Sequence, residues 1–514
     1  MKPLFIGAAG FLALAAAFAS VGSRTASQAK ATPWRVAQFE NVLGTSMEIK
    51  LLAASQSDSN RAEAAALSEI KRLNAVLSGY DPSSEFSRWA KTRDKAVPVS
   101  SDLMQVLALW DSWRARTGGA LNPAAEAVTQ AWKKAEASAR PPSEAEMAAA
   151  ASAANQSHWR LDKSSGVATR LTDTPLMLNS FTKSYIVERA ALAALKTPGV
   201  SGVVVNIGGD LVVRGAGTDS VAVADPHSDA ENSDPIAVLD IRDRAVATSG
   251  NYRRGFDIGG THYSHIVDPR TGHTADAVIS ATVAAPKAVD AGALATTFCV
   301  LSPEESRDLA ASVPGAQYLI IEKSGVRHTS PGWSALFAFA APAAAAPQNK
   351  SGEARPEVGL WDPAFELTIH LELPQMGGFG ARRPYVAVWI ENQDHFPVRT
   401  IAVWHQKPRY LEDLRAWYRA EQMRAAAEKT EILRSVSGAT RAPGKYSFVW
   451  DGKDNSGKLV KAGKYTVLIE AAREHGGYNL VHREMDFNGE PAEVQIPAQG
   501  ELGAISLHYA KVSR

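Results

Sequence analysis

The chain of 514 residues has little cysteine and no excess of charge of either sign. Its single cysteine, Cys299, cannot form an internal disulfide and is expected to be a small buried side chain. Lys and Arg number 55 against 54 Asp and Glu, so the net charge of +1 gives no indication of a nucleic-acid surface. The hydrophobic fraction of 45% is typical of a globular protein, and this length predicts roughly two to four domains.

Long apolar runs are missing from the chain except at its N-terminus. Lys2 precedes the apolar run Leu4–Ala19, and small residues near Ala19 and Ala29 resemble cleavage sites. We therefore predict a signal peptide over residues 1–29 rather than a retained anchor, because the run is short for a bilayer span. The mature protein is expected to be soluble, to have no membrane span and to be exported, which in a bacterium means periplasmic.

The sequence has no internal repeat and divides into two unlike parts. Residues 34–335 alternate strand-like and helix-like patterns, whereas residues 359–514 are mostly strand and hairpin patterns. Between them, residues 340–356 are rich in Ala and Pro without periodicity and are predicted to be a linker. This organisation predicts an α+β domain, not a doubly wound one, followed by an all-β domain.

Individual elements follow from hydrophobic periodicity. In the first part we predict strands at Asn41–Leu52, Val203–Ile207 and Val278–Ala284, and helices at Ser57–Ser78 and Asp290–Leu301. In the second part we predict strands at Phe365–Leu373, Tyr385–Glu391, Arg399–Trp404, Tyr446–Trp450 and Tyr465–Glu470, a hairpin turn at Asp451–Gly457 and one helix at Leu411–Lys429. The second part is predicted to be an immunoglobulin-like sandwich with one inserted helix.

The most informative motif is Thr248–Tyr252 followed by Tyr263–Gly272, which contains His265. A histidine between small polar groups and beside a turn can transfer a proton next to a bound phosphate, although by itself it could equally be a core residue. The Gly-rich turns Thr117–Pro123 and Asn206–Asp210 let the backbone approach a ligand closely, or serve as ordinary turns. No Walker-type loop is present, so any phosphate would be held by such turns.

Taken in order with the segment Ser78–Arg88, these motifs resemble the ApbE family, the periplasmic FAD:protein FMN transferases. The likeness extends over residues 35–335. It implies that FMN is moved from FAD to a Thr or Ser of an exported redox protein, with AMP released. Such phosphoryl transfer needs backbone amides, a hard divalent cation such as Mg²⁺, and a group that accepts the hydroxyl proton.

The resemblance also implies residue roles. It places His265 at the family's histidine implicated in transfer. It implies FAD contacts at Tyr80, Ala120, Leu121, Asn122, Lys183 and Val267. It implies metal contacts at the Ser180 carbonyl and at Thr296, with Asp290 as a carboxylate that could reach the site if the helix start is reshaped.

Some positions depart from the family pattern. The family's metal-binding Asp is Gly292 here, another Asp is Met177, a third is Asn122, and the family's early Met is Leu43. Loss of carboxylates around a metal and a pyrophosphate should weaken metal binding and slow transfer. The alternative function is therefore a catalytically impaired, flavin-binding protein of the periplasm.

The second part resembles a poorly characterised exported family found fused to ApbE-like domains, in the segments Tyr385–Asn392, Ser437–Gly444 and Trp450–Gly452. Ser437–Thr440 reads Ser-Gly-Ala-Thr. One interpretation is a tight turn leading into the strand at Tyr446. The other is a flavinylation target in which Thr440 receives FMN, in cis through the high effective concentration that the linker provides or from another transferase. The domain would then be a tethered electron carrier.

Overall fold

The computed structural model describes residues 33–512 apart from 229, 252–253, 338–358, 376–381, 407, 431 and 475. The predicted signal peptide (1–29) and linker (340–356) lie outside the described residues and stay predictions. Residues Trp34–Arg514 belong to one compact unit. Within the described part of the chain, no helix has the length and apolar character needed to cross a membrane.

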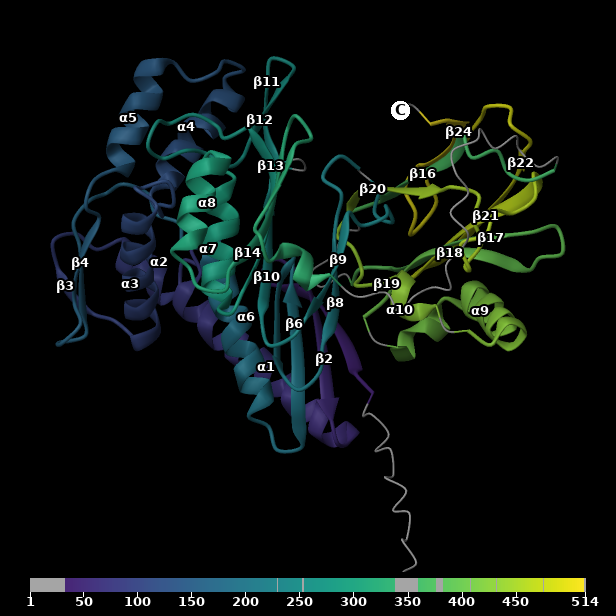
Figure 1. Cartoon of the computed structure of the whole chain (residues 1–514), viewed down its shortest axis with the longest axis horizontal. Helices are drawn as coiled ribbons and strands as arrows, with labels where there is room; N and C mark the ends of the chain where they lie inside the picture. Colours follow the sequence, from purple (N-terminus) through teal and green to yellow (C-terminus); the bar gives the residue numbers. More distant parts are fainter. Residues whose placement is uncertain are drawn as a thin grey trace, which may run out of the picture. The chain divides into compact units, whose positions relative to one another are not determined.

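An eight-stranded sheet organises the first part, in the order β1-β2-β6-β7-β10-β13-β14-β15 (Figure 1). Its strands are β1 Arg35–Val42, β2 Thr45–Ala53, β6 Val200–Ile207, β7 Asp210–Gly215, β10 Ala245–Gly250, β13 Val278–Ala285, β14 Gln317–Glu322 and β15 Arg327–Thr329. Every neighbouring pair is antiparallel. The α+β prediction is therefore confirmed, because a doubly wound fold requires parallel strands.

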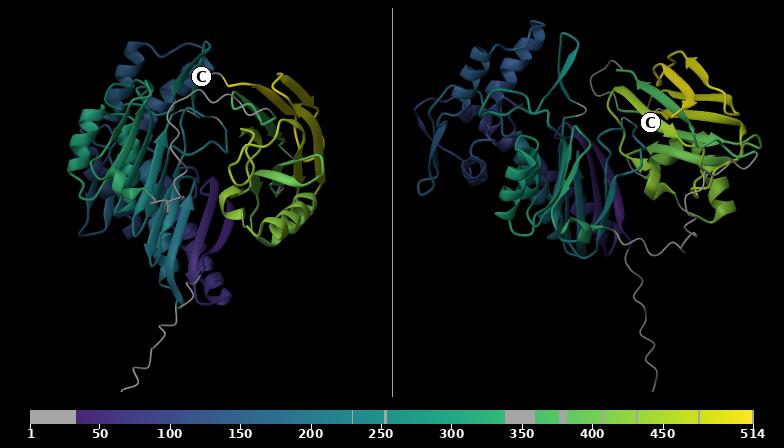
Figure 2. Two further views of the ribbon diagram at one scale, coloured as in Figure 1. Left: turned by 45° about the vertical axis from the view of Figure 1, so that its right-hand side comes forward. Right: turned by 45° about the horizontal axis from the view of Figure 1, so that its top comes forward.

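The two faces of this sheet bury separate cores. Helices α1 (Gln56–Leu77), α6 (Asn179–Leu195) and α7 (Ala288–Phe298) cover one face, as the two views of Figure 2 show. Hairpin β8–β9 (Asp219–Val223, Ala237–Ile241) and the 3₁₀ turn Trp333–Leu336 cover the other. Strand β6 serves both cores because successive side chains alternate: Val203 and Val205 face the helices, and Val204 faces the hairpin.

A group of smaller elements extends beyond the sheet. It comprises α2 Glu85–Ala90, α3 Ser101–Arg116, α4 Ala125–Ala137, α5 Glu144–Ala154, α8 Pro303–Ala311, the sheet of β3 Ala96–Pro98, β4 Trp159–Asp162 and β5 Val167–Arg170, and the hairpin of β11 Gly255–Ile258 and β12 Thr261–Ser264. Trp132 on α4 stacks on Phe256 of β11 with ring centroids 6.1 Å apart. Its indole N–H donates to the Gly272 carbonyl at 2.9 Å. Helix α4 thereby fixes both the hairpin and the turn that follows it.

The predicted single strand at Asn41–Leu52 is wrong. The chain forms a hairpin there, with β1 ending at Val42 and β2 beginning at Thr45. Leu43 and Gly44 make the turn with φ of 51° and 79°. Gly44 is a turn signal in the sequence, but Leu43 is not, because leucine rarely adopts a positive φ; a periodicity argument weighs neither.

The second part is a β-sandwich, as predicted. One sheet has the order β20-β16-β24-β23 and the other β19-β18-β17-β21-β22. The strands are β16 Phe365–Leu373, β17 Tyr385–Glu391, β18 Pro397–Trp404, β19 Ser437–Gly438, β20 Gly444–Trp450, β21 Gly463–Ala472, β22 Tyr478–Phe487, β23 Ala492–Ile496 and β24 Ile505–Lys511. Aromatic side chains fill the space between the sheets, where Trp361 and Phe487 contact each other and each contacts the rings of both Trp450 and Tyr509.

Helices lie between β18 and β20, where one inserted helix was predicted. The segment Leu411–Lys429 is divided: a 3₁₀ turn covers Pro408–Asp413 and α9 covers Arg415–Glu428, with a short α10 at Leu433–Val436. Glu470 of β21 organises the division, because its carboxylate accepts the backbone N–H groups of Ala416 at 3.0 Å and Trp417 at 2.8 Å. These are N–H groups of the first helical turn, which have no partner within the helix.

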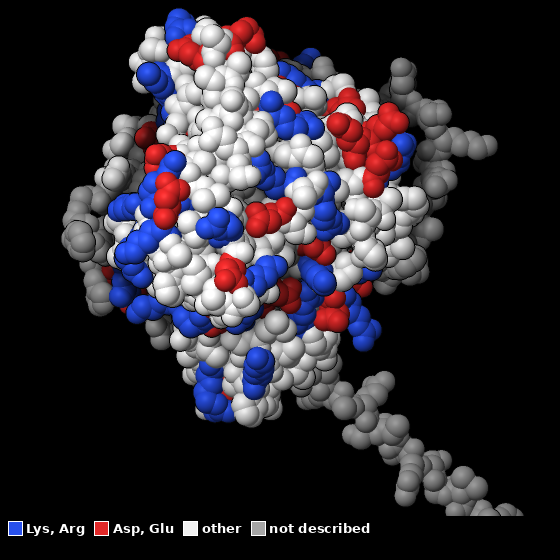
Figure 3. Space-filling model, turned by 90° about the vertical axis from the view of Figure 1, so that its left-hand side faces the viewer, with Lys and Arg blue, Asp and Glu red and all other residues white. Residues whose placement is uncertain are grey.

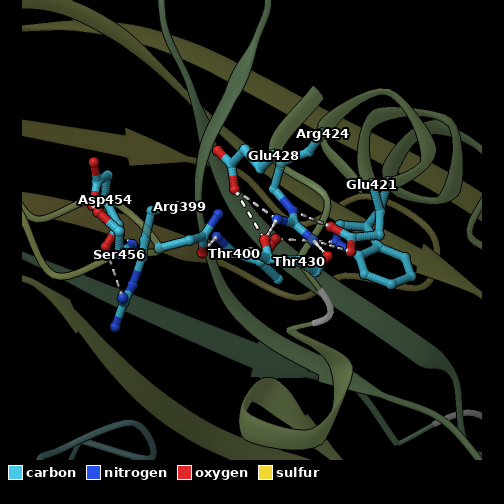
Figure 4. A network of polar contacts seen from close by, with 10 residues as sticks. Arg399, Thr400, Glu421, Arg424, Glu428, Thr430, Asp454 and Ser456 are labelled. Atoms are coloured by element: carbon cyan, nitrogen blue, oxygen red, sulfur yellow. Dashed lines mark hydrogen bonds and ion pairs between the residues drawn. The ribbon is translucent and has the colours of Figure 1, made fainter. Parts of the chain in front are cut away.

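A buried guanidinium ties α9 to the segment that follows it (Figure 4). The Arg424 side chain is fully buried and makes a two-bonded ion pair with Glu421, at 2.8 and 2.6 Å. It also donates to Glu428 at 2.6 Å and to the hydroxyl and carbonyl of Thr430 at 2.7 and 2.9 Å. These contacts use all five N–H groups that a guanidinium offers.

The surface carries charges of both signs. On the face shown in Figure 3, Lys and Arg side chains are interspersed with Asp and Glu side chains. This mixture agrees with the net charge of +1.

Candidate active site

The N-terminal turn of α6 meets the turn that carries Tyr80. The side-chain amide of Asn179 donates to the Tyr80 hydroxyl at 2.6 Å. The Ser78 hydroxyl accepts the backbone N–H groups of Tyr80 at 3.2 Å and Asp81 at 3.1 Å. Tyr80 is nevertheless 77% exposed. A large aromatic ring is thus held in a fixed position at the surface, where a planar ligand can stack on it.

The segment Ala120–Asn122 lies beside the same end of α6. All three residues are buried. The Asn122 amide donates to the Ala154 carbonyl at 2.8 Å and accepts the Ala124 N–H at 2.9 Å. Met177 N–H donates to the Pro123 carbonyl at 2.8 Å, which joins this segment to α6. Because the Asn122 side chain is used internally, any contact of this segment with a cofactor would come from its backbone.

Lys183 points from α6 to the Gly-Gly-Asp turn between β6 and β7. Its ammonium donates to the Gly208 carbonyl at 3.1 Å and lies 3.2 Å from an Asp210 carboxylate oxygen. The second Asp210 oxygen accepts the Ser184 hydroxyl at 2.6 Å. Burial raises the pKa of Asp210 above its ordinary value, and Lys183 and Ser184 oppose this shift. The turn also touches the β1–β2 hairpin, because a Cβ at Gly208 would lie 2.7 Å from the Thr45 side chain.

Helix α7 carries Asp290 and Thr296, two of the three residues predicted to bind metal. Thr296 pairs with the Ser249 hydroxyl of β10 at 3.2 Å. Gly292 shares a helix face with Thr296, one turn earlier. Asp290 is displaced from Thr296 by about 120° around the helix axis. Burial raises the pKa of Asp290, and the charges that oppose the shift are those of Lys287 and Arg116. Asp290 and Thr296 therefore belong to different faces of α7.

His265 follows β12 directly. Its Nδ1 lies 3.0 Å from the Arg254 carbonyl oxygen. A carbonyl accepts only, so Nδ1 carries the proton and Nε2 keeps its lone pair. Burial lowers the pKa of His265 below its ordinary value; the charge of Arg254 adds to this and the hydrogen bond to the Arg254 carbonyl opposes it. The imidazole is thus held in the neutral tautomer that can accept a proton at Nε2.

The turn after His265 is rigid and partly buried. Val267 is 6% exposed and packs with Val128, Trp132 and Phe256. Asp268 forms an ion pair with Arg270 at 2.8 Å, and its carbonyl accepts the Gly272 N–H at 2.8 Å. The packing of Val267 and the contacts of Asp268 therefore hold the segment that follows His265.

Thr440 lies outside these contacts, next to β1. It is 1% exposed, and its hydroxyl donates to the Glu40 carboxylate. Burial raises the pKa of Glu40. Ser437–Gly438 form β19, which pairs in parallel with Val403 and Trp404 of β18. The interpretation of these first two residues as part of a tight turn is therefore wrong.

Sequence reasoning missed some residues of this site. It named the Asn206–Asp210 turn but gave Asp210 no role, and it gave none to Ser184 or Asn179. The carbonyl of Arg254 could not be foreseen either, because only the hairpin of β11 and β12 brings it to His265. The sequence did contain one indication of a role for Asp210, because its carboxylate comes directly after two glycines at the end of a predicted strand.

Together these contacts describe three parts of an α+β protein: the start of α6, the Gly-Gly-Asp turn that it contacts, and a histidine-bearing loop. The ApbE family matches residues 43–320. This match covers more than half of the chain, and the chain belongs to the ApbE family. A second family, described as a predicted periplasmic protein (DUF2271), matches residues 366–504.

Curated relatives and a solved structure agree with this assignment. The chain is 30% identical over 281 residues to the FAD:protein FMN transferase of Treponema pallidum, covering 50% of this chain and 77% of that protein. It is 26% identical over 293 residues to that of Klebsiella pneumoniae, covering 55% and 83%. The crystal structure of the ApbE protein of Thermotoga maritima superposes with a TM-score of 0.53 and 26% identity, over 60% of this chain and 100% of that one. These relatives support a flavin transferase.

Proposed function

We propose that this protein is a FAD:protein FMN transferase that attaches FMN to a Thr or Ser of an exported redox protein. The observation that carries the proposal is the tautomer of His265. Its Nδ1–H is committed to the Arg254 carbonyl, so Nε2 can take a proton from an acceptor hydroxyl. Proton transfer by a positioned histidine typically accelerates a reaction by about 10²–10⁴.

The proposed reaction exchanges a phosphoanhydride bond of FAD for a phosphoester bond to the acceptor. The acceptor oxygen forms a bond to the phosphorus of the FMN half of FAD. The bond between that phosphorus and the bridging oxygen of the pyrophosphate breaks, and AMP leaves with the bridging oxygen. The hydroxyl proton goes to Nε2 of His265. No oxidant or reductant is required, because the flavin keeps its oxidation state.

FAD would lie between the residues that the family likeness indicates. The exposed ring of Tyr80 offers a surface for the flavin to stack on, and the backbone of Ala120–Asn122 and the packed Val267 would flank it. Lys183 would face the phosphates, since a lysine binds phosphate as a point charge.

Mg²⁺ belongs to the proposal because phosphoryl transfer benefits from a divalent cation that neutralises charge on the phosphates. The residues predicted to hold it do not fit together. The Ser180 carbonyl lies in the first turn of α6, where helix geometry directs it to the Ser184 N–H. Asp290 and Thr296 lie on different faces of α7. Among the described residues, no group of three or more His, Cys, Asp or Glu side chains could hold a metal ion. No step of the proposed reaction therefore depends on a metal ion held by these residues.

Export to the periplasm is also part of the proposal. It rests on the predicted signal peptide at residues 1–29 and on the family described as periplasmic that matches residues 366–504. The acceptor would meet the enzyme in that compartment.

Incubation of the mature protein with FAD, Mg²⁺ and a Thr-containing acceptor peptide tests the function. We expect AMP and an FMN-modified peptide in equal amounts, measured by chromatography and mass spectrometry. FAD that stays bound and intact, with no AMP formed, would contradict the transferase proposal.

The rate of transfer should depend on pH through His265. A base must be neutral, and the pKa of His265 is lowered by burial. We expect kcat/KM to stay constant from neutral pH downward until the pH falls below about 6.5, the ordinary histidine value, and then to decline. A midpoint above that value would contradict a buried neutral base.

A second candidate function is a flavin-binding or flavinylated electron-transfer protein. The observation in its favour is that Gly292 and Met177 stand where the family has carboxylates. In its flavinylated form, FMN is attached at Thr440. Thr440 is buried against Glu40, so attachment requires that contact to open.

Peptide mass spectrometry distinguishes a protein that only binds flavin from one that carries FMN on Thr440. We expect the tryptic peptide that ends at Arg441 to remain unmodified in folded protein, and to gain the mass of FMN after Glu40→Ala releases the Thr440 hydroxyl. Thr440→Val in the same background is the matched control. A peptide that stays unmodified in Glu40→Ala with an active transferase present would remove the internal target.

A further inference from the structure

The Lys183 ammonium uses two of its three N–H donors within the protein. Of its three N–H groups, one reaches the Gly208 carbonyl at 3.1 Å and another the Asp210 carboxylate at 3.2 Å. The side chain is 30% exposed, so the ammonium lies at the edge between the protein interior and solvent. The remaining N–H is available to an anion that approaches from outside.

Asp210 is held on both sides. Its carboxylate is 10% exposed, and its two oxygens have different partners: the Lys183 ammonium, and the Ser184 hydroxyl at 2.6 Å. Because both oxygens of the buried Asp210 carboxylate have a partner, the carboxylate is held in one orientation. The Lys183 ammonium that it contacts is therefore held in one position.

Ser184 reaches Asp210 only because residue 292 is glycine. A Cβ at position 292 would lie 2.2 Å from the Ser184 hydroxyl oxygen and 3.3 Å from the Phe181 Cα. Both helices pack through these positions, so the hydroxyl would have to turn away from Asp210. Glycine at 292 and serine at 184 are therefore a matched pair across the contact of α6 and α7.

We propose that Ser184 and Asp210 are positioning residues that hold the Lys183 ammonium as the resident positive charge for the phosphates of FAD, and that Gly292 leaves the room they need. The proposal rests on the proposed function, since FAD is the ligand. The proposal explains why the Asp210 carboxylate contacts Lys183. It also agrees with the finding that the described residues include no cluster of His, Cys, Asp or Glu that could hold a divalent ion.

Binding of three flavins tests the proposal. Dissociation constants of the full chain for FAD, FMN and riboflavin are measured by flavin fluorescence in the presence of EDTA. Lys183→Met should weaken FAD about tenfold, because one charge-assisted hydrogen bond is lost. Riboflavin, which has no phosphate, should bind as before. Lys196→Met, at the exposed C-terminal end of α6, is the matched control.

The positioning role is tested by combining substitutions. Asp210→Ala should weaken FAD but not riboflavin, and Lys183→Met/Asp210→Ala should be no weaker than Lys183→Met. If Asp210 merely opposes the phosphate charge, Asp210→Ala will strengthen FAD binding and overturn the proposal. Equal losses for FAD and riboflavin would overturn it as well.

Two milder variants cover the case in which Asp210→Ala does not fold. Ser184→Ala and Gly292→Ala both leave the carboxylate in place and should each weaken FAD by about threefold to tenfold, without effect on riboflavin. Unchanged FAD binding in both would contradict the roles of Ser184 and Gly292. AMP release is measured separately, so Lys183-dependent FAD binding without AMP would refute the transferase and leave this inference intact.

Discussion

His265→Ala should lower the rate of FMN transfer by about 10²–10⁴ while the affinity for FAD changes little. The imidazole is placed by a hydrogen bond from Nδ1 to the Arg254 carbonyl, and the turn behind it is fixed by the packing of Val267. Removing the ring deletes the proton acceptor without disturbing the groups expected to face FAD. Single-turnover AMP release at saturating FAD measures the loss.

His262 provides a matched control for this experiment. It lies on β12, exposed, with its ring paired to Asp257 at 2.8 Å. His262→Ala removes the same kind of side chain three residues earlier, within β12, and should leave transfer within a factor of about two, as surface substitutions usually do. Equal rates in His265→Ala and His262→Ala would show that the proton goes elsewhere. A loss confined to FAD affinity would make His265 a binding residue instead.

Arg424→Met should destabilise the second part by about 3–5 kcal/mol, the usual cost of breaking a buried ion pair from one side. The substitution keeps much of the apolar volume but leaves Glu421 without the guanidinium that pairs with both of its oxygens. Urea unfolding followed by tryptophan fluorescence reports the change, because Trp417 is buried on the same helix.

Two comparison variants isolate the cause. Arg419→Met alters an exposed arginine of α9 and should change the free energy of unfolding by no more than about 0.5 kcal/mol. Glu421→Leu/Arg424→Met removes both charges and should be more stable than Arg424→Met alone, because no unpaired carboxylate stays buried. If Glu421→Leu/Arg424→Met loses as much stability as the two single variants lose together, the network contributes through packing and not through charge.

Periodicity predicted the elements whose burial follows a simple pattern. Strands β16 and β17 have the predicted bounds, since their side chains alternate or are buried throughout. Strand β22 was not predicted: His482, Arg483 and Glu484 at its centre are all exposed and interrupt the alternation that marks a strand. The segment Leu411–Lys429 was predicted as one helix because Leu414, Trp417 and Tyr418 share an apolar side, whereas the Glu470 carboxylate caps a helix that begins only at Arg415.

Sequence reasoning could single out candidate site residues that lie within one continuous motif. It could not predict contacts between residues of different helices and strands. Local sequence was enough to single out His265 and the glycine turns. The partnership of Ser184 with Asp210 joins α6 to β7, and its dependence on Gly292 joins α6 to α7. Such a dependence is a property of three-dimensional packing, so sequence reasoning saw in Gly292 a lost ligand and not the space it leaves.

The position of β2 in the large sheet affects how the chain can fold. β2 ends at Ala53, but its neighbour β6 begins at Val200, so the β1–β2 hairpin has no second partner until much of the first part has been synthesised. Pairing over such a sequence separation is slow because the intervening loop must close first. The proposed export would benefit from this delay, because the sheet stays incomplete until late in synthesis. Under the proposed export, the strand order would let the chain complete its sheet after it has crossed the membrane.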